Sequence, residues 1–426
     1  MRRVDQRRFD NQPIAPDASY LNGKQAAALL GVKRETLYAY ASRGLIRSEP
    51  AGRGTRERRY HREDLQRLKA RHDARAGHGA VAAAALRWGE PVLESALTAI
   101  DAGGPRYRGH SALELAGRLA FEAVAELLWT GTVPTPVAEW SSRTLGVRLG
   151  PISSLVLDRA PATATFALVI PALAAADPDR FDADPVADLQ RARSIIRRTA
   201  AFAGFADGES RVRAAIAEPS VARILLVSLG ARPTAASERA MNQALVLIAD
   251  HELNVSSFTA RVAASAGADL YACVSAGLAT LSGPRHGGML SRVEALLAEI
   301  GRPERARAII HDRTARGEEI PGFGHPLYPQ GDPRGRVLLE SAFAMAPRNR
   351  VLRTLFALIE AMRDASRPDP TVDLGLVAVA RALRLPRESA VAMFAVGRAA
   401  GWIAHAFEQR AAGFLLRPRA RYVGPA

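Results

Sequence analysis

Two histidines set against glycines, and a carboxylate that follows a proline, constrain this 426-residue chain more than any other feature. They lie far apart in the sequence, so a fold that uses them together must bring distant segments to one place. Glycine lets a substrate approach the backbone closely. A carboxylate that removes a carbon-bound proton, with imidazoles that stabilise oxygens, suits enolisation next to a carbonyl. The segments are Gly283-Pro284-Arg285-His286-Gly287-Gly288, Gly322-Phe323-Gly324-His325 with Asp332-Pro333-Arg334 after it, and Pro370-Thr371-Val372-Asp373.

Composition bounds the class of protein. The chain is 48% hydrophobic with only 6% aromatic residues, which is typical of a mostly helical, soluble globular protein. Cys273 is the single cysteine, which excludes an internal disulfide and predicts a cytoplasmic location. The most apolar stretch, residues 166–176, is too short to cross a bilayer and contains Pro171, so we expect no membrane partner.

The positive charge is concentrated at the N-terminus. The whole chain carries a net charge of +15, and residues 1–79 hold 18 Lys and Arg against 9 Asp and Glu. A charge excess confined to one end is what a nucleic-acid-binding module would show. Much of the remaining positive charge reflects a general preference for arginine in this chain, and arginines on a surface are usually just solvated.

The N-terminal segment carries a helix-turn-helix pattern. Residues 24–30 and 35–42 predict two short helices, each ending at a glycine, and an arginine-rich stretch at 53–62 precedes a third predicted helix at 62–71. The segment resembles the winged helix-turn-helix of MerR and excisionase proteins. The resemblance is carried by the motifs A-A-x-L-L-G-V-x-x-x-T-L-Y, G-L-I and R-R-Y-x-x-x-D-L. There the second helix enters the major groove and the wing contacts phosphates. The resemblance implies DNA contacts from Lys33, Arg34, Thr36, Tyr38, Arg53, Arg56, Arg58 and Arg59.

The remainder of the chain resembles the citrate synthase family over roughly residues 88–424. The resemblance is carried by Arg106-Tyr107-Arg108-Gly109, by residues 127–134 ending in G-x-V-P, by H-E-x-N-x-S from His251, and by the histidine and aspartate motifs above. It implies a mostly all-α, two-domain citrate synthase-like fold, with a large and a small helical domain closing over a cleft. A small winged helix-turn-helix domain precedes it. The predicted segments are a disordered N-terminus at 1–19, a helix-turn-helix domain at 20–76, a linker at 77–85, and a citrate synthase-like domain at 86–426 whose small subdomain spans about 287–385.

The same resemblance implies a reaction. An acyl-CoA, either acetyl-CoA or propionyl-CoA, would condense with oxaloacetate to give citrate or 2-methylcitrate and CoA. Asp373 would be the base, His286 would stabilise the enol and His325 would assist attack on the ketone. The implied oxaloacetate ligands are His251, Arg334, Arg398 and Arg417, and Arg417 would reach the partner's site in a homodimer. The chemistry needs no metal or redox cofactor, and the CoA thioester is a co-substrate.

Some alternatives stay open. Taken alone, Asp373 could equally cap the helix predicted to start at Leu374. Many family members carry a basic residue for a coenzyme A phosphate where this chain has Pro329; Arg285 or Arg336 could substitute. A second function also fits: a DNA-binding transcriptional regulator that uses the citrate synthase-like body as a dimerising metabolite sensor. A third alternative makes the N-terminal module an appendage on a working enzyme.

Overall fold

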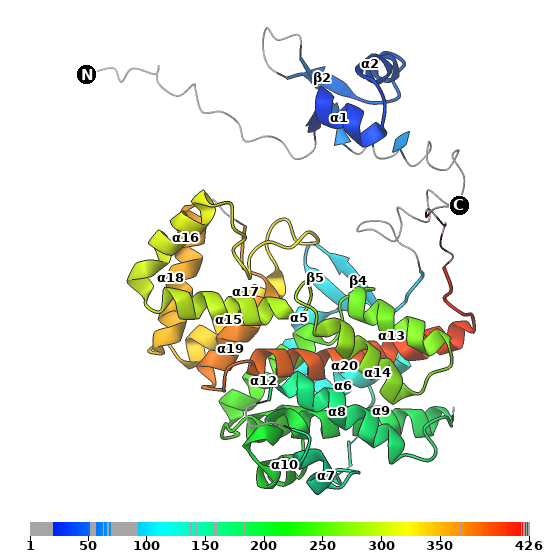
Figure 1. Ribbon diagram of the computed structural model, residues 1–426, viewed down its shortest axis with the longest axis vertical. Coiled ribbons are helices and arrows are strands. Elements are labelled where there is room, and N and C mark those ends of the chain that lie inside the picture. Colours follow the sequence, from blue (N-terminus) through cyan, green and yellow to red (C-terminus); the bar gives the residue numbers. More distant parts are fainter. Residues whose placement is uncertain are drawn as a thin grey trace. The chain divides into compact units, whose positions relative to one another are not determined.

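The computed structural model describes residues 20–51, 57–62, 64–65, 68–69, 93–136, 139–141, 143–156, 160–182, 184–365, 368–418, 420, 422 and 424. The chain divides into two compact units, Met1–Glu94 and Ser95–Ala426 (Figure 1). The segment predicted to be disordered, the predicted linker, and the predicted DNA contacts Arg53 and Arg56 lie outside the described residues.

The first unit has the predicted winged helix-turn-helix arrangement. Its strands pair antiparallel in the order β1-β3-β2. Asn22 caps the first helix with a side chain that accepts from the backbone N–H of Gln25, and Gly31 ends that helix in the left-handed conformation. The small core is formed by Ala26, Leu37, Ile46, Tyr60 and Leu65. The elements are β1 (Tyr20–Asn22), α1 (Gly23–Leu30), α2 (Arg34–Ser42), β2 (Ser48–Pro50) and β3 (Arg58–His61).

The second unit is helical apart from one three-stranded antiparallel sheet of order β4-β5-β6. Its mostly helical character confirms the predicted fold class. Its strands are β4 (Thr98–Asp101), β5 (Gly104–Tyr107) and β6 (His110–Ser111). Its α-helices are α5 (Ala112–Arg118), α6 (Phe121–Thr130), α7 (Leu149–Ser153), α8 (Ala162–Ala175), α9 (Pro185–Ala201), α10 (Glu209–Ile216), α11 (Val221–Ser228), α12 (Ala235–Ile248), α13 (Val255–Ser265), α14 (Leu270–Leu281), α15 (Gly288–Ile300), α16 (Ala306–Ala315), α17 (Pro333–Met345), α18 (Arg350–Asp364), α19 (Val372–Ala382) and α20 (Ser389–Ala412), with short 3₁₀ turns at Phe202–Asp207 and Pro303–Arg305.

Helix α20 is the central element of this unit. It packs against α6, α8, α9, α12, α13, α14 and α19, and Figure 1 shows it running among these helices. By length and composition alone it could cross a membrane, but 89% of its most apolar window is buried inside the protein. It therefore has the character of a core helix, and it carries Arg398 and His405 into the interior.

Helices α15 to α19 form a smaller group, with α17 and α19 in closest contact. Two glycines make that contact possible. A Cβ at Gly335 would lie 2.6 Å from the carbonyl oxygen of Thr371, and one at Gly375 would lie 2.8 Å from Leu338. Because any side chain at Gly335 would strike backbone, the start of α19 is held directly against α17.

Candidate active site

His286 lies just before α15 and is held by the start of α13. Its Nε2 is 2.9 Å from Ser256 Oγ, and Ser256 Oγ also accepts the indole N–H of Trp402 at 3.0 Å. Asn254 caps α13 by accepting the backbone N–H groups of Ser256 and Ser257, each at 3.1 Å. The sequence predicted a catalytic role for His286 but none for Ser256, although Ser256 is the serine of the H-E-x-N-x-S motif.

Ser256 controls which nitrogen of His286 carries the proton. The hydroxyl donates its one proton to Asn254 Oδ1 at 2.7 Å, because that amide oxygen can only accept. Ser256 Oγ is then an acceptor for His286, so Nε2 donates and the neutral ring carries its proton on Nε2. Donation from Nδ1 of His286 to an enolate would require the hydroxyl to turn from Asn254 to Nε2.

His251, His325 and Tyr328 form an aromatic cluster. The ring centroids of His251 and His325 are 5.4 Å apart, and Tyr328 lies 5.1 Å from His325. His251 Nε2 is 2.8 Å from the Tyr328 hydroxyl. The backbone N–H of Leu327 donates to His325 Nδ1 at 3.2 Å, so neutral His325 carries its proton on Nε2. The predicted substrate ligand His251 and the predicted catalytic residue His325 are therefore adjacent, together with a tyrosine for which the sequence predicted no role.

Arg334 is buried at the start of α17 and is tied to Asp332. Its Nε and Nη2 donate to the two carboxylate oxygens at 3.0 and 2.9 Å. Asp332 also accepts the backbone N–H of Val372, the first residue of α19, at 3.0 Å. Burial alone would raise the pKa of Asp332, but Arg334 and these hydrogen bonds hold it below its usual value. Asp332 thus joins the arginine to the helix that bears Asp373.

Asp373 lies in the first turn of α19. Thr371 is the N-cap residue, so the alternative that Asp373 caps this helix is wrong: the helix begins at Val372, one residue before Asp373. The Thr371 hydroxyl donates to Asp373 Oδ2 at 3.1 Å. Burial raises the pKa of Asp373 from its ordinary value. A raised pKa makes this carboxylate a stronger base when it is ionised.

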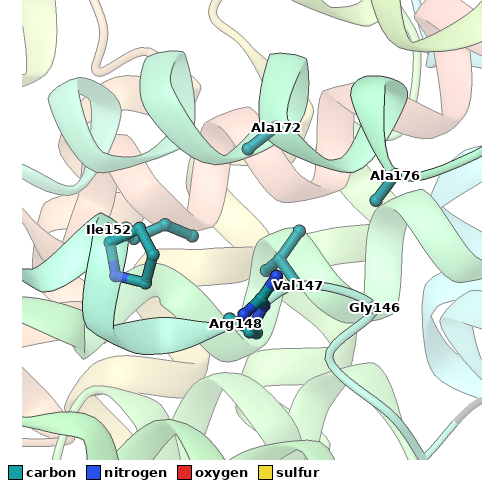
Figure 2. Close-up of a pocket in the computed structure, with 7 residues that line it drawn as sticks. Gly146, Val147, Arg148, Ile152, Ala172 and Ala176 are labelled. Atoms are coloured by element: carbon teal, nitrogen blue, oxygen red, sulfur yellow. The ribbon is translucent and has the colours of Figure 1, made fainter.

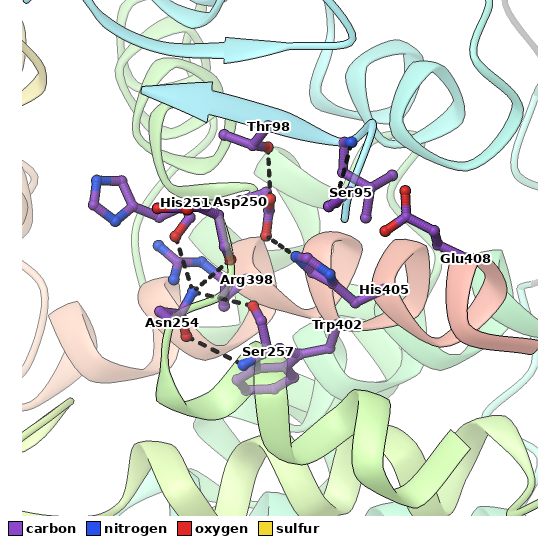
Figure 3. A network of polar contacts seen from close by, with 12 residues as sticks. Ser95, Thr98, Asp250, His251, Asn254, Ser257, Arg398, Trp402, His405 and Glu408 are labelled. Carbon is purple, nitrogen blue, oxygen red and sulfur yellow. Dashed lines mark hydrogen bonds and ion pairs between the residues drawn. The ribbon is translucent and has the colours of Figure 1, made fainter. Parts of the chain in front are cut away.

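Arg398 lies on α20 near Asp250 and His251 (Figure 3). It is buried and donates to the carbonyl oxygen of Ile248 at 2.7 Å. Its guanidinium lies 4.7 Å from the ring centroid of Phe394. Burial, together with the charge of Arg334, lowers the pKa of Arg398 to about 10, so it stays protonated at neutral pH. Within the described part of the chain, no carboxylate lies at ion-pair distance from it. The charge of Asp250 acts on Arg398 without forming an ion pair, so this buried cation keeps room for an anionic ligand.

A buried pair lies behind this arginine. His405 Nε2 is 3.4 Å from Asp250 Oδ1, and Thr98 donates to the other oxygen at 2.6 Å (Figure 3). Asp250 directly precedes His251 in the chain. His405 was expected to be structural, and its full burial against Asp250 agrees with that expectation.

The histidines of the site are neutral at physiological pH. Burial lowers the pKa of His286 to about 4, with a further contribution from Arg398. Burial and the two arginines hold the pKa of His251 well below its usual value, and burial with Arg334 lowers that of His325. Neutral imidazoles beside two guanidiniums can donate hydrogen bonds to carbonyl and carboxylate oxygens.

The structure does not bring every predicted residue into this site. Arg417 is exposed in the segment that follows α20. A separate hollow of about 590 Å³, lined by Gly146, Val147, Arg148, Pro151, Ile152, Ala172 and Ala176, shares no residue with the site (Figure 2). In the first unit, Lys33, Arg34 and Tyr38 are exposed on and beside α2, and Thr36 is half-buried.

Arg58 and Arg59, the two described wing arginines that were predicted to contact DNA, bind neighbouring residues of the same unit. Arg58 donates to the side chain and carbonyl oxygen of Ser48, both at 3.0 Å. Arg59 forms an ion pair with Glu49 at 2.8 Å and lies 5.2 Å from the ring centroid of Tyr20. These contacts hold the hairpin together, and the charge of Arg59 is compensated within it.

Comparisons with known proteins agree with both resemblances. A model of the citrate synthase C-terminal domain family matches residues 85–419, and a helix-turn-helix domain model matches residues 20–73. Citrate synthase 2 of Bacillus subtilis is 31% identical over 337 residues, which cover 75% of this chain and 90% of that protein. A 2-methylcitrate synthase of Mycobacterium tuberculosis is 32% identical, with coverages of 75% and 84%.

Solved structures give the same answer. The citrate synthase of Thermotoga maritima superposes with a TM-score of 0.68 at 27% identity, covering 79% of this chain and 94% of that one. The citrate synthase of Thermoplasma acidophilum, solved with carboxymethyl coenzyme A and oxaloacetate, gives a TM-score of 0.69 at 26% identity with the same coverages.

Proposed function

Because the chain belongs to the citrate synthase family, we propose that it condenses an acyl-CoA thioester with oxaloacetate and releases CoA. One observation carries the proposal: the buried cation Arg398 is close enough to two histidines and a carboxyl to interact with them electrostatically. In addition to burial, its charge lowers the pKa values of His251 and His286, and the charge of Asp373 acts on Arg398 in turn. A binding site for an anion is thus combined with an acid–base set. The relatives named citrate synthase and 2-methylcitrate synthase, and the ternary complex of the archaeal neighbour, support the same reaction class.

The residues divide the chemistry between them. Asp373 removes a proton from the α-carbon of the thioester, and His286 donates N–H to the oxygen of the resulting enol. The α-carbon then bonds to the ketone carbon of oxaloacetate while His325 donates a proton to the ketone oxygen. Water finally cleaves the carbon–sulfur bond and CoA leaves as the thiol. The proposal uses no metal or redox cofactor.

Oxaloacetate would be held by His251, Arg334 and Arg398. Guanidiniums suit carboxylates because they can donate two parallel hydrogen bonds. The exposed position of Arg417 supports a role outside its own chain's site, and we propose that it completes the site of a partner subunit in a homodimer. The acyl donor stays open, because acetyl and propionyl groups differ by one methylene, worth only about 1–3 kcal/mol in a pocket. A cytoplasmic location also stays a prediction.

The test is thiol release by the purified full chain, given oxaloacetate with acetyl-CoA or with propionyl-CoA. Turnover that Asp373→Ala abolishes, and that Asp364→Ala leaves intact, supports the proposal; Asp364 is an exposed aspartate paired with Arg307 on the surface. The donor with the higher kcat/KM identifies the product. A folded wild-type protein that releases no thiol with either donor would contradict the reaction.

DNA binding by the first unit is a second candidate function, and the exposed face of α2 favours it. Lys33, Arg34 and Tyr38 lie exposed at and after the N-terminus of this helix, whose first turn also carries the exposed Glu35. A helix N-terminus flanked by cations suits phosphate oxygens and base edges.

The DNA candidate is tested by fluorescence anisotropy with the full chain and mixed-sequence duplex DNA. We expect the affinity to fall steeply with salt, and the salt slope to decrease when Lys33 and Arg34 are both replaced by alanine. Arg307→Ala in the second unit should leave the affinity unchanged. Binding that does not depend on salt would exclude phosphate contacts. Repeating the titration with oxaloacetate present tests the sensor alternative, which requires the affinity to change.

A further inference from the structure

Tyr328 contacts two residues proposed to hold oxaloacetate, His251 and Arg334, and the proposed proton donor His325, but the proposed chemistry leaves it without a role. Its hydroxyl is 2.8 Å from His251 Nε2, and its ring centroid is 5.1 Å from that of His325. The guanidinium carbon of Arg334 lies 5.2 Å from the centre of the same ring. Tyr328 is only 4% exposed, so it lies inside the site and not on the surface.

Two consecutive turns fix the backbone of this tyrosine. Its N–H donates to the carbonyl oxygen of His325 at 2.9 Å, and its own carbonyl oxygen accepts the N–H of Gly331 at 3.0 Å. Pro326 and Pro329 each occupy the second position of one turn, where the fixed φ of proline fits. Gly331 has a φ of +99°, which other residues rarely adopt. Pro329, which stands where many family members carry a basic residue, therefore also makes the position of Tyr328 rigid.

The bond between Tyr328 and His251 determines which imidazole nitrogen is protonated. Burial raises the pKa of Tyr328 to about 12, so the phenol keeps its proton. Burial and the arginines keep His251 neutral. A phenol is a much stronger acid than a neutral imidazole N–H, so the hydroxyl donates and Nε2 accepts. Neutral His251 then carries its ring proton on Nδ1.

We propose that Tyr328 is a positioning residue for the oxo-dicarboxylate substrate, because its hydroxyl holds His251 in the tautomer whose Nδ1–H donates to the substrate. The ring of Tyr328 also covers one face of Arg334, which leaves that guanidinium a restricted set of orientations for a carboxylate. This inference rests on the proposed function and deepens it: Tyr328 acts on the binding of oxaloacetate and has no part in activating the thioester.

The test compares Tyr328→Phe with the matched control Tyr271→Phe. Tyr271 is also buried and donates its hydroxyl to a carboxylate, Asp177, at 3.0 Å, but it contacts none of the site residues. By calorimetry, Tyr328→Phe should bind oxaloacetate about tenfold more weakly, since it leaves a buried ring nitrogen unpaired. The KM for acyl-CoA should not change, and the control should behave like wild type. Equal or tighter oxaloacetate binding by Tyr328→Phe would overturn the proposal.

Failure of this inference can be separated from failure of the proposed function. Wild-type protein that binds no oxaloacetate overturns both, whereas tight binding by wild type and Tyr328→Phe alike overturns only the role of Tyr328. The tautomer has its own readout in protein labelled with ¹⁵N-histidine, with the His251 signals assigned by their loss in His251→Gln. Wild type should show a proton on Nδ1 of His251. A proton on Nε2 would refute the proposal even if Tyr328→Phe failed to fold.

Discussion

Replacing Gly335 by alanine is expected to slow the condensation through backbone displacement alone. A Cβ at this position would lie 2.6 Å from the carbonyl oxygen and 2.7 Å from the carbonyl carbon of Thr371, and 3.1 Å from the backbone nitrogen of Val372. All three atoms belong to the start of α19, so no flexible side chain can move aside. The first turn of that helix carries Asp373, the proposed base.

The size of the effect follows from the overlap. Taking about 3.3 Å as a close carbon–oxygen contact, the start of α19 must move by about 0.7 Å relative to α17. A misplacement of about 1 Å can cost about 100-fold in rate, so kcat should fall by about 10- to 100-fold. Overpacking of this kind also costs about 1–3 kcal/mol of stability.

The assay is steady-state thiol release together with thermal unfolding of the same preparations. Gly117→Ala is the matched control, because Gly117 is also helical, on α5, and a Cβ there meets no atom within 4 Å. The control should keep wild-type kcat and be at least as stable, since alanine favours helix over glycine. If folded Gly335→Ala kept the kcat of wild type, contact between α17 and α19 would not be what positions Asp373.

Three further predictions concern the groups of the site. Asp373→Asn should lower kcat by orders of magnitude yet raise Tm at neutral pH. The pKa of Asp373 is raised in the folded state, so ionising this carboxyl lowers the free energy of unfolding as pH rises above the ordinary aspartate pKa, and asparagine avoids that loss. Because the pKa of Asp373 is raised, kcat should fall with decreasing pH at a pH above the ordinary aspartate pKa. His286, with a pKa of about 4, is still neutral in that pH range. Ser256→Ala should lower kcat without changing the oxaloacetate affinity measured by calorimetry, because it loses the hydrogen bond that determines which nitrogen of His286 is protonated. Weaker oxaloacetate binding by this variant would contradict a role of Ser256 that acts through His286 alone. Mixed dimers of Arg417→Ala and Asp373→Ala, each inactive alone, should recover activity, and failure of the mixture would argue against a shared site.

The fold was predictable where local signals are strong. The first two helices were expected at residues 24–30 and 35–42 and lie at Gly23–Leu30 and Arg34–Ser42. Gly31 and Gly44 mark both ends because each has a positive φ, which few residues other than glycine adopt. The limits of the small subdomain remain a prediction, although α15 to α19 pack together there.

The partners of the catalytic groups were not predictable in the same way. Tyr328 is 77 residues from His251, Ser256 is 30 residues from His286, and Asp332 is 40 residues from Val372. Periodicity and capping rules describe neighbours within a helix turn, and they do not identify pairs at such distances. Ser256 stood within the H-E-x-N-x-S motif and Tyr328 lies between the histidine and arginine motifs, but only the three-dimensional contacts show what they bind.

The charges of the site also bear on the dimer. Arg334 is already neutralised by Asp332 through two hydrogen bonds, so among the described residues Arg398 is the buried cation of the site that has no carboxylate at ion-pair distance. Oxaloacetate carries two negative charges, and ionised Asp373 adds a third. Anions brought together out of water need compensating cations, because burying unpaired charge is costly. One chain therefore supplies too little positive charge for an ionised base beside a bound dianion, and an arginine from outside the chain, such as Arg417 of a second copy, would restore the balance. On this argument a monomer that binds oxaloacetate would keep Asp373 protonated and inactive, so loss of the dimer should abolish turnover.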